Sequence, residues 1–211
     1  MNIYVSDKEQ IEMIKTWWRE NGRFTILSVA AALIISAGWR FWQNNKLQDS
    51  ANASVIYEQM LNQESHQDIS AAEYEVTNLL TNHPRTPYAS LASFVSAQNA
   101  INANNLEGAS EKFDWIIANS KNADFKQIAK IRKARLMIAM QKYDEGLQLL
   151  NNPSSETYLP LINEVKGDLL AAKGDIKGAL GAYQNALNSL RKDASNREFL
   201  LMKYNHLKST S

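Results

Sequence analysis

The chain carries two patterns of apolar positions: one continuous apolar segment near its start, and a three-and-four spacing from there to its end. The continuous segment covers residues 24–42 and holds no charged residue as far as Trp39. Trp17 and Trp18 precede it, and Trp39 and Trp42 stand at its end. The inner members, Trp18 and Trp39, stand about 31 Å apart in a helix that rises ~1.5 Å per residue, which matches the ~30 Å hydrocarbon core of a bilayer. Because tryptophan prefers the headgroup level, the pattern predicts a single transmembrane helix over residues 24–42.

Two alternatives stay open for this segment. One is a buried core helix, although such a helix would not need aromatic pairs at both ends. The other is a cleaved signal sequence, for which Ser36-Ala37-Gly38 offers small residues at a cleavage site. Signal sequences usually begin with a short basic region, whereas residues 1–23 form a long region with four acidic residues. We favour an uncleaved anchor.

The lysines and arginines near the segment predict its orientation. Four of them precede it, and two, Arg40 and Lys46, follow it closely. Since basic residues accumulate on the cytoplasmic side of a span, we expect the N-terminus in the cytoplasm. The large C-terminal part would then lie outside the cytoplasm, which means the periplasm if the cell is a Gram-negative bacterium.

The flanks of the segment are polar. Residues 1–23 are expected to form a cytoplasmic segment with a short amphipathic helix, which begins at a capping box over residues 6–9. Asn21-Gly22 favours a turn and predicts a break before the span, the alternative being one uninterrupted helix. Residues 43–52 are read as a linker, either a short exit from the membrane or a continuous helix into the next domain.

Small residues recur every four positions within the span, at Ser28, Ala32 and Ser36. Such a stripe lets a second helix approach closely, so it is a candidate surface for membrane helix packing. Stripes of this kind also arise by chance, and the two readings weigh equally.

Residues 53–211 predict an all-α domain, because the apolar spacing is three-four throughout and no useful stretch alternates with period two. Four units repeat at intervals of 37, 37 and 33 residues, marked by a small residue near the start of each second helix: Ala72, Ala109, Gly146 and Ala179. Twelve residues earlier stand Met60, Ala97, Ala134 and Gly167. The period and the small positions are those of a tetratricopeptide-like solenoid of helical hairpins. Residues 196–208 are expected to form a terminal capping helix.

Composition removes several classes of function. From Leu47 onward the chain has 17 lysines and arginines and 18 aspartates and glutamates. It has no basic stripe that would indicate a nucleic-acid partner. There is no cysteine. The three histidines, His66, His83 and His206, have no partner at metal-ligand spacing. We therefore expect no metal, no cofactor and no catalytic group, and the chain is not read as an enzyme.

The first helix of each hairpin lines the concave side of a solenoid, which gives a set of candidate protein-binding residues. They are Tyr57, Leu61, Leu91, Phe94, Gln98, Ile101, Ile128, Ile131, Arg135, Leu161, Glu164 and Asp168. The alternative is that neighbouring helices or the C-terminal helix cover these side chains. A basic run over residues 126–135 is either a solvated helix face or a patch for an acidic partner or lipid headgroups.

Several short motifs together resemble the ancillary SecYEG translocon subunit family of proteobacteria. They are Asn21-Gly22, Gly38-Trp39-Arg40-Phe41-Trp42, Tyr88-Ala89-x-Leu91-Ala92, Ile131-Arg132-x-Ala134-Arg135 and Gly167-x-x-Leu170-x-x-Lys173-Gly174-Asp175. The resemblance covers nearly the whole chain, whereas the acidic start and the C-terminal tail match less well.

The resemblance implies a single-span inner-membrane protein with a periplasmic tetratricopeptide-like domain. It implies three kinds of protein partner: the SecYEG translocon, a membrane-anchored periplasmic peptidyl-prolyl isomerase-like chaperone, and exported client proteins. The implied role is to help pass newly exported proteins to periplasmic chaperones. The alternative is an envelope assembly or signalling adaptor whose repeats bind a partner outside the Sec system.

Overall fold

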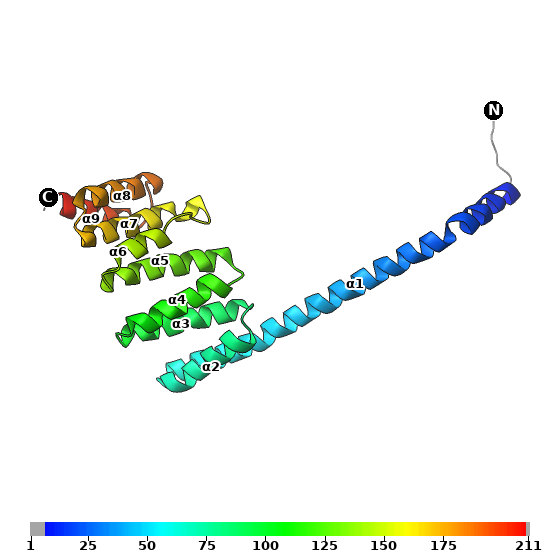
Figure 1. Ribbon diagram of the computed structural model, residues 1–211, viewed down its shortest axis with the longest axis horizontal. Coiled ribbons are helices and arrows are strands. Elements are labelled where there is room, and N and C mark those ends of the chain that lie inside the picture. The colour runs from blue at the N-terminus through cyan, green and yellow to red at the C-terminus, as the bar shows by residue number, and fades with distance from the viewer. Residues whose placement is uncertain (1–6, 210–211) are drawn as a thin grey trace, which may run out of the picture. The chain divides into compact units, whose positions relative to one another are not determined.

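The computed structural model describes residues 7–209, which are helical with no strand (Figure 1). The contacts divide the chain into two units between Asp49 and Ser50. The helices are α1 (Asp7–Ser65), α2 (Ile69–Asn82), α3 (Pro87–Asn102), α4 (Leu106–Asn119), α5 (Ala123–Ala139), α6 (Tyr143–Leu149), η1 (Glu156–Tyr158), α7 (Leu159–Lys173), α8 (Ile176–Ser189) and α9 (Arg197–Ser209). This confirms the all-α class.

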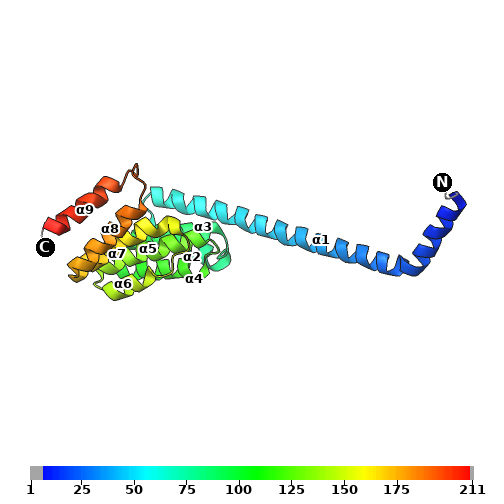
Figure 2. The same ribbon diagram turned by 90° about the horizontal axis from the view of Figure 1, so that it is seen from above.

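Helix α1 runs without interruption through the residues where a break was expected. The prediction of a helix end at Asn21-Gly22 is wrong, although α1 bends within its blue first part in Figure 2. Asn21 keeps its side chain on its own helix by donating to the Trp17 carbonyl at 3.2 Å. The Trp18 ring covers Gly22, where an added Cβ would stand 3.3 Å from the ring. Gly22 thus lies inside a continuous helix, with the ring of Trp18 packed against it.

The other expectations for the N-terminal part have mixed outcomes. Residues 43–52 belong to α1, so of the two forms considered the structure has the continuous helix. The expected capping box involves Ser6, which lies outside the described residues. The limits 1–23 and 24–42 remain predictions.

Every hairpin closes with the same turn. A residue in the left-handed region ends each first helix, and the amide that follows donates to a carbonyl five residues earlier, at distances of 2.8 to 3.0 Å. The left-handed residues are Gln67, Asn104, Gln141 and Gly174. In three turns the next side chain, Asp68, Asn105 or Asp175, then caps the second helix. Repetition of one turn four times is direct structural support for the repeat register.

The predicted crossing positions are buried in all four hairpins. Two of them show how little room there is. A Cβ added at Gly167 would stand 2.4 Å from the Tyr183 ring, and one at Gly146 would stand 2.7 Å from Leu169 Cδ2. The remaining crossing residues, each at most 2 % exposed, are Met60, Ala72, Ala97, Ala109, Ala134 and Ala179. Small residues therefore occupy these crossing positions, except in the first hairpin, where Met60 stands.

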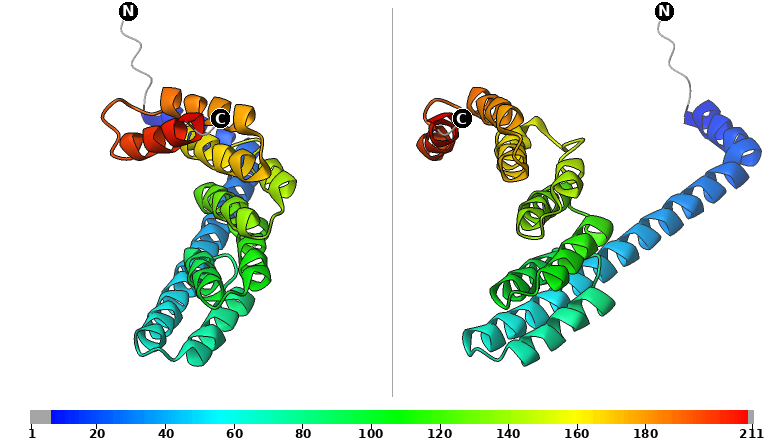
Figure 3. Two further views of the ribbon diagram at one scale, coloured as in Figure 1. Left: turned by 90° about the vertical axis from the view of Figure 1, so that its left-hand side faces the viewer. Right: turned by 60° about the vertical axis from the view of Figure 1, so that its left-hand side comes forward.

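The apolar side chains between hairpins form the core of the second unit. Successive helices pack on their neighbours, so the hairpins stack in chain order from α2 to α8 in Figure 1. At the end of the stack α9 lies against α8, as Figure 3 shows, and buries Leu200 beside Tyr183 and Leu187. Helix α9 covers nearly the range expected for a capping helix, and its Phe199 and Met202 stay more than half exposed.

Replacing Gly167 with alanine should lower the melting temperature of the full chain in detergent. The new Cβ meets the ring of Tyr183, and overpacking typically costs ~1–3 kcal/mol. The matched control is Gly181→Ala in α8, where an added Cβ finds no atom within 4 Å. Alanine at that exposed helical position should raise stability by up to ~1 kcal/mol. Circular dichroism measures both melting temperatures. Equal shifts of the melting temperature in the two variants would refute the close crossing.

Candidate functional site

The predicted protein-binding residues fall into three groups by exposure. The exposed ones are Leu61, Gln98 and Arg135. The half-buried ones are Tyr57, Leu91, Ile101, Ile128, Leu161 and Asp168, and the buried ones are Phe94, Ile131 and Glu164. The open surface on the first helices of the hairpins is therefore smaller than the set expected from the sequence.

Phe94 shows why periodicity overestimates this surface. Its ring lies 6.2 Å from the ring of Phe113 and 6.1 Å from that of Phe125, which come from the two following helices. The guanidinium of Arg132 stands over the same ring at 4.9 Å. Phe94 is thus part of the interior between the second and third hairpins, and the neighbouring exposed residue Gln98 presents this face instead.

The basic run over residues 126–135 is largely paired within the chain. The ammonium group of Lys133 lies 2.5 Å from Asp114, and that of Lys126 donates to the Ala118 carbonyl at 3.4 Å. Arg135 lies 4.0 Å from Glu164. Most of this run therefore stabilises contacts between helices, and Lys130 is the member for which no such contact exists among the described residues.

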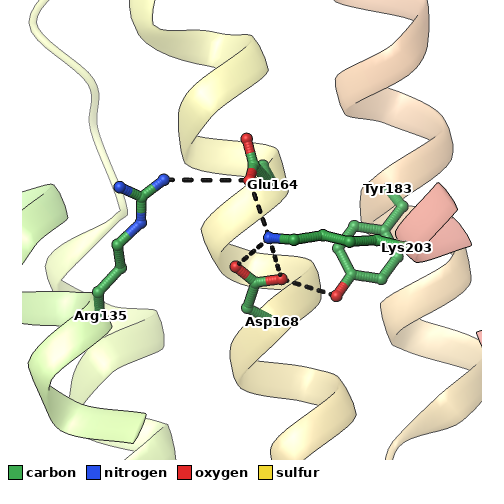
Figure 4. A network of polar contacts seen from close by, with 5 residues as sticks. All are labelled: Arg135, Glu164, Asp168, Tyr183 and Lys203. Atoms are coloured by element: carbon green, nitrogen blue, oxygen red, sulfur yellow. Dashed lines mark hydrogen bonds and ion pairs between the residues drawn. The ribbon is translucent and has the colours of Figure 1, made fainter. Parts of the chain in front are cut away.

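A polar network closes the C-terminal end of the stack (Figure 4). Lys203 of α9 donates to Glu164 at 2.8 Å and to both oxygens of Asp168 at 2.9 Å, and these two acids stand one turn apart on α7. Tyr183 of α8 donates to Asp168 at 2.7 Å. The network joins three helices, and Arg135 of α5 adds a longer contact to Glu164. Two predicted binding residues, Glu164 and Asp168, are thereby covered by the C-terminal helix.

The network is partly buried, and its contacts change two pKa values. Burial, together with the hydrogen bond to Asp168, raises the pKa of Tyr183 far above its usual range. Burial alone would lower the pKa of Lys203, but its hydrogen bonds and ion pairs with Glu164 and Asp168 outweigh that effect and raise it. Removal of one partner would leave a charge without compensation in a partly buried site.

Sequence reasoning did not find Lys203. A lysine on an amphipathic terminal helix ordinarily faces water, so its spacing carries no signal. The available hint was the pair Glu164 and Asp168, one turn apart on a face that the repeat pattern makes concave. Two acids at that spacing repel each other, which a nearby cation relieves, but the sequence alone does not say which cation.

The apolar part of α1 differs from every other helix because its side chains have no protein around them. Among the described helices, α1 is the one that is long and apolar enough to cross a membrane. None of its most apolar stretch is buried. A core helix would be mostly buried, so that alternative does not fit. Ser28 and Ser36 bond back to carbonyls of their own helix, at 2.8 and 2.9 Å, and Ala32 lies exposed between them. The stripe therefore consists of small side chains, and both of its hydroxyl groups already donate within α1.

Aromatic and basic residues mark the end of the apolar segment. The rings of Trp39 and Trp42 lie 5.4 Å apart, and the ammonium group of Lys46 stands over the Trp42 ring at 5.5 Å. An amphipathic ring next to a cation suits the headgroup region. Among residues 7–209, no group of three or more histidine, aspartate and glutamate side chains is placed to hold a metal ion.

Comparison with known proteins places these features in context. The family model for the tetratricopeptide repeat-like domain matches residues 15–209. A protein named ancillary SecYEG translocon subunit from Escherichia coli (strain K12) is 27% identical over 98% of this chain and 99% of its own length. Proteins of the same name come from Neisseria gonorrhoeae, at 26% identity over 99% and 100%, and from Aggregatibacter actinomycetemcomitans, at 27% over 88% and 91%. No solved structure matches this chain. The resemblance noted from the short motifs is confirmed.

Above pH 10 the free energy of unfolding should fall as pH rises. The unfolded chain releases the Tyr183 proton near pH 10, whereas the folded chain retains it, so the unfolded state binds fewer protons. Lys203 acts in the same direction, because its stabilising charge is present below its unfolded pKa and is lost as pH passes its raised folded value. Urea titrations of the full chain in detergent at several pH values measure this slope.

The tyrosine contribution is isolated by comparing two variants. Tyr183→Phe should be less stable than wild type at pH 8 and should lose less stability between pH 9.5 and about 11. The control is Tyr74→Phe, at an exposed position that should keep the wild-type slope. A wild-type slope in Tyr183→Phe would show that the proton of Tyr183 does not stabilise the folded chain.

Proposed function

Since this chain belongs to the tetratricopeptide repeat-like domain family, we propose that it is a membrane-anchored scaffold that associates with the Sec translocon. The observation that carries the proposal is full-length similarity to proteins named ancillary SecYEG translocon subunit, which includes the apolar segment as well as the repeats. Stacked helical repeats form extended binding surfaces, so the proposal is one of binding and assigns no catalytic step.

In this proposal the apolar part of α1 spans the bacterial inner membrane once. The distribution of lysine and arginine supports a cytoplasmic N-terminus and a periplasmic solenoid. The stripe of Ser28, Ala32 and Ser36 would receive a helix of the translocon, because close approach requires small side chains at four-residue spacing. Its hydroxyl groups already bond within α1, so packing rather than hydrogen bonding would supply the contact.

The exposed residues on the first helices would contact the second partner. We propose that this partner is a membrane-anchored periplasmic peptidyl-prolyl isomerase-like chaperone, and that exported client proteins pass between the two. Leu61 and Gln98 are the exposed positions that such a contact would use. Anchoring turns the second contact into an intramolecular one, which increases avidity by about 10²–10⁴ when the geometry allows it.

Photo-crosslinking in cells tests both contacts. A photoreactive residue at Val29, which lies beside the stripe, should give adducts with translocon subunits, and one at Ile34, on the opposite face of α1, should give fewer. A probe at Leu61 should give adducts with the chaperone or an exported chain, and one at Tyr74, exposed on α2, should not. Correct insertion without adducts from Val29 or Leu61 would favour a different envelope partner.

Changing Ser28, Ala32 and Ser36 together to leucine should abolish copurification with the translocon and leave membrane insertion intact. Leucine preserves the apolar character of the span but fills the space that a partner helix would enter. Leucine at Ile34, on the opposite face of α1, provides the control, since that position is already large and apolar. If the triple variant still retains the translocon at the wild-type level, the stripe is not the contact surface.

A further inference from the structure

The first arm of α1, residues 7–20, carries an apolar face that no other part of the described chain covers. Ile11, Ile14 and Trp18 are each more than half exposed. At about 100° per residue, these three side chains leave the helix within an arc of about 60°. Met13 and Trp17, which are also more than half exposed, extend the face on one side. A helix of this length is marginal in water when nothing packs on it, so the face indicates a surface that supports the helix.

The charged residues of the first arm are sorted by direction. Glu9 and Glu20 leave the helix on the side opposite to Trp18, and Glu12 lies nearer to that side than to the apolar face. The cations gather on one flank between the two faces: they are Lys8, Lys15 and Arg19. The acids would thus lie farthest from a surface beneath the apolar face. The cations would lie at its level, where their long apolar stems let the charges reach headgroup phosphates.

The bend of α1 is a second, independent observation. Figure 2 shows the first arm turning away from the long apolar arm that follows, and we call the bend, residues 21–25, the elbow. A hollow of about 370 Å³ is lined by residues from both arms. Trp18 comes from the first arm, whereas Val29 and Leu33 come from the second. The apolar face of the first arm therefore lies on the inner side of the elbow and faces the same medium as the apolar arm.

The polar groups of the elbow are bonded within the helix. Asn21 donates to the Trp17 carbonyl at 3.2 Å, and Thr25 donates to the Asn21 carbonyl at 3.0 Å. Gly22 is buried beneath the ring of Trp18. Pairing of this kind is what the boundary between headgroups and acyl chains requires of a helix.

Lipid is the occupant that these observations favour. A protein partner would have to fill the elbow and contact both arms at once. Acyl chains do so wherever the apolar arm crosses a bilayer, because they surround that arm and end at the level of the elbow. The tryptophan pair of the first arm, whose rings lie 6.3 Å apart, suits the same level.

We propose that residues 7–20 form an interfacial helix that binds the lipid surface of the membrane through Ile11, Ile14 and Trp18. The helix lies along the surface for about 20 Å at ~1.5 Å per residue, and acyl chains fill the elbow. Glu9 and Glu20 face the water. The inference rests on the proposed span of α1 across the membrane, and it does not depend on contact with the translocon or with a chaperone.

Electron paramagnetic resonance of the full chain in nanodiscs of phosphatidylethanolamine and phosphatidylglycerol tests the proposal. The chain has no cysteine, so one introduced cysteine carries the only spin label. Labels at Ile11 or Ile14 should collide more often with oxygen, which enters the bilayer. Labels at Thr16 or Glu20 should collide more often with a water-soluble nickel complex. The ratio of the two collision rates should be at least ~3-fold higher at Ile14 than at Thr16. A label at Leu33 reports separately whether the apolar arm lies in the bilayer.

Two variants that add the same charge provide a matched comparison. Ile14→Glu places a carboxylate on the face toward the bilayer, so the oxygen-to-nickel ratio at a label on Ile11 should fall to the value found at Thr16. Thr16→Glu places it on the opposite face and should leave the ratio at Ile11 unchanged. Melting temperatures of both variants verify that the solenoid is folded in each.

Four results would overturn the proposal. Equal ratios at Ile14 and Thr16, with Leu33 in the bilayer, would show that the first arm has no face on the lipid. Equal effects of Ile14→Glu and Thr16→Glu would show that the apolar face is not the contact. An Ile14 label that is in water in lipid alone, and is shielded once the translocon is added, would assign the face to a protein. A Leu33 label in water would overturn the span itself, and this inference with it.

Discussion

The close crossing of two helices within each hairpin is the constraint on which the second unit depends. Where the axes approach most closely, a single extra carbon atom would overlap a neighbour, as the 2.4 Å separation between a Cβ at Gly167 and Tyr183 demonstrates. That ring in turn reaches Asp168 through its hydroxyl group. The glycine therefore decides both the packing of the last hairpin and the position of the donor that orients an acid on α7.

A solenoid built in this way has an unfinished surface at its end, because each hairpin covers its apolar face with the next one. Helix α9 solves this by placing Leu200 against the last hairpin and Lys203 between two carboxylates. The ion pairs gain little over well-packed apolar residues, since desolvation offsets much of their attraction. What they contribute is orientation, because an apolar contact alone would let α9 slide or rotate on α8.

The sequence predicted those features that depend on spacing and failed for those that depend on three-dimensional neighbours. The crossing residues and the capping helix follow from periodicity, and Ala72, Ala109 and Ala179 lie where they were expected. Asn21-Gly22 was misjudged because a turn preference is weak beside the continuity of a long helix, and a tryptophan ring fills the space above the glycine. The burial of Phe94 and the partners of Lys203 come from other hairpins, so no local pattern could indicate them.

The balance of exposed and covered residues also bears on the strength of binding. Of the twelve candidate positions on the first helices, only Leu61, Gln98 and Arg135 are exposed, and Arg135 already lies near Glu164. So small a surface binds weakly by itself, because association must first offset the loss of translational and rotational freedom. In the proposed function, anchoring in the membrane would reduce that cost by holding both partners at a high effective concentration. A weak contact within an anchored assembly would allow the release that the proposed transfer of clients requires.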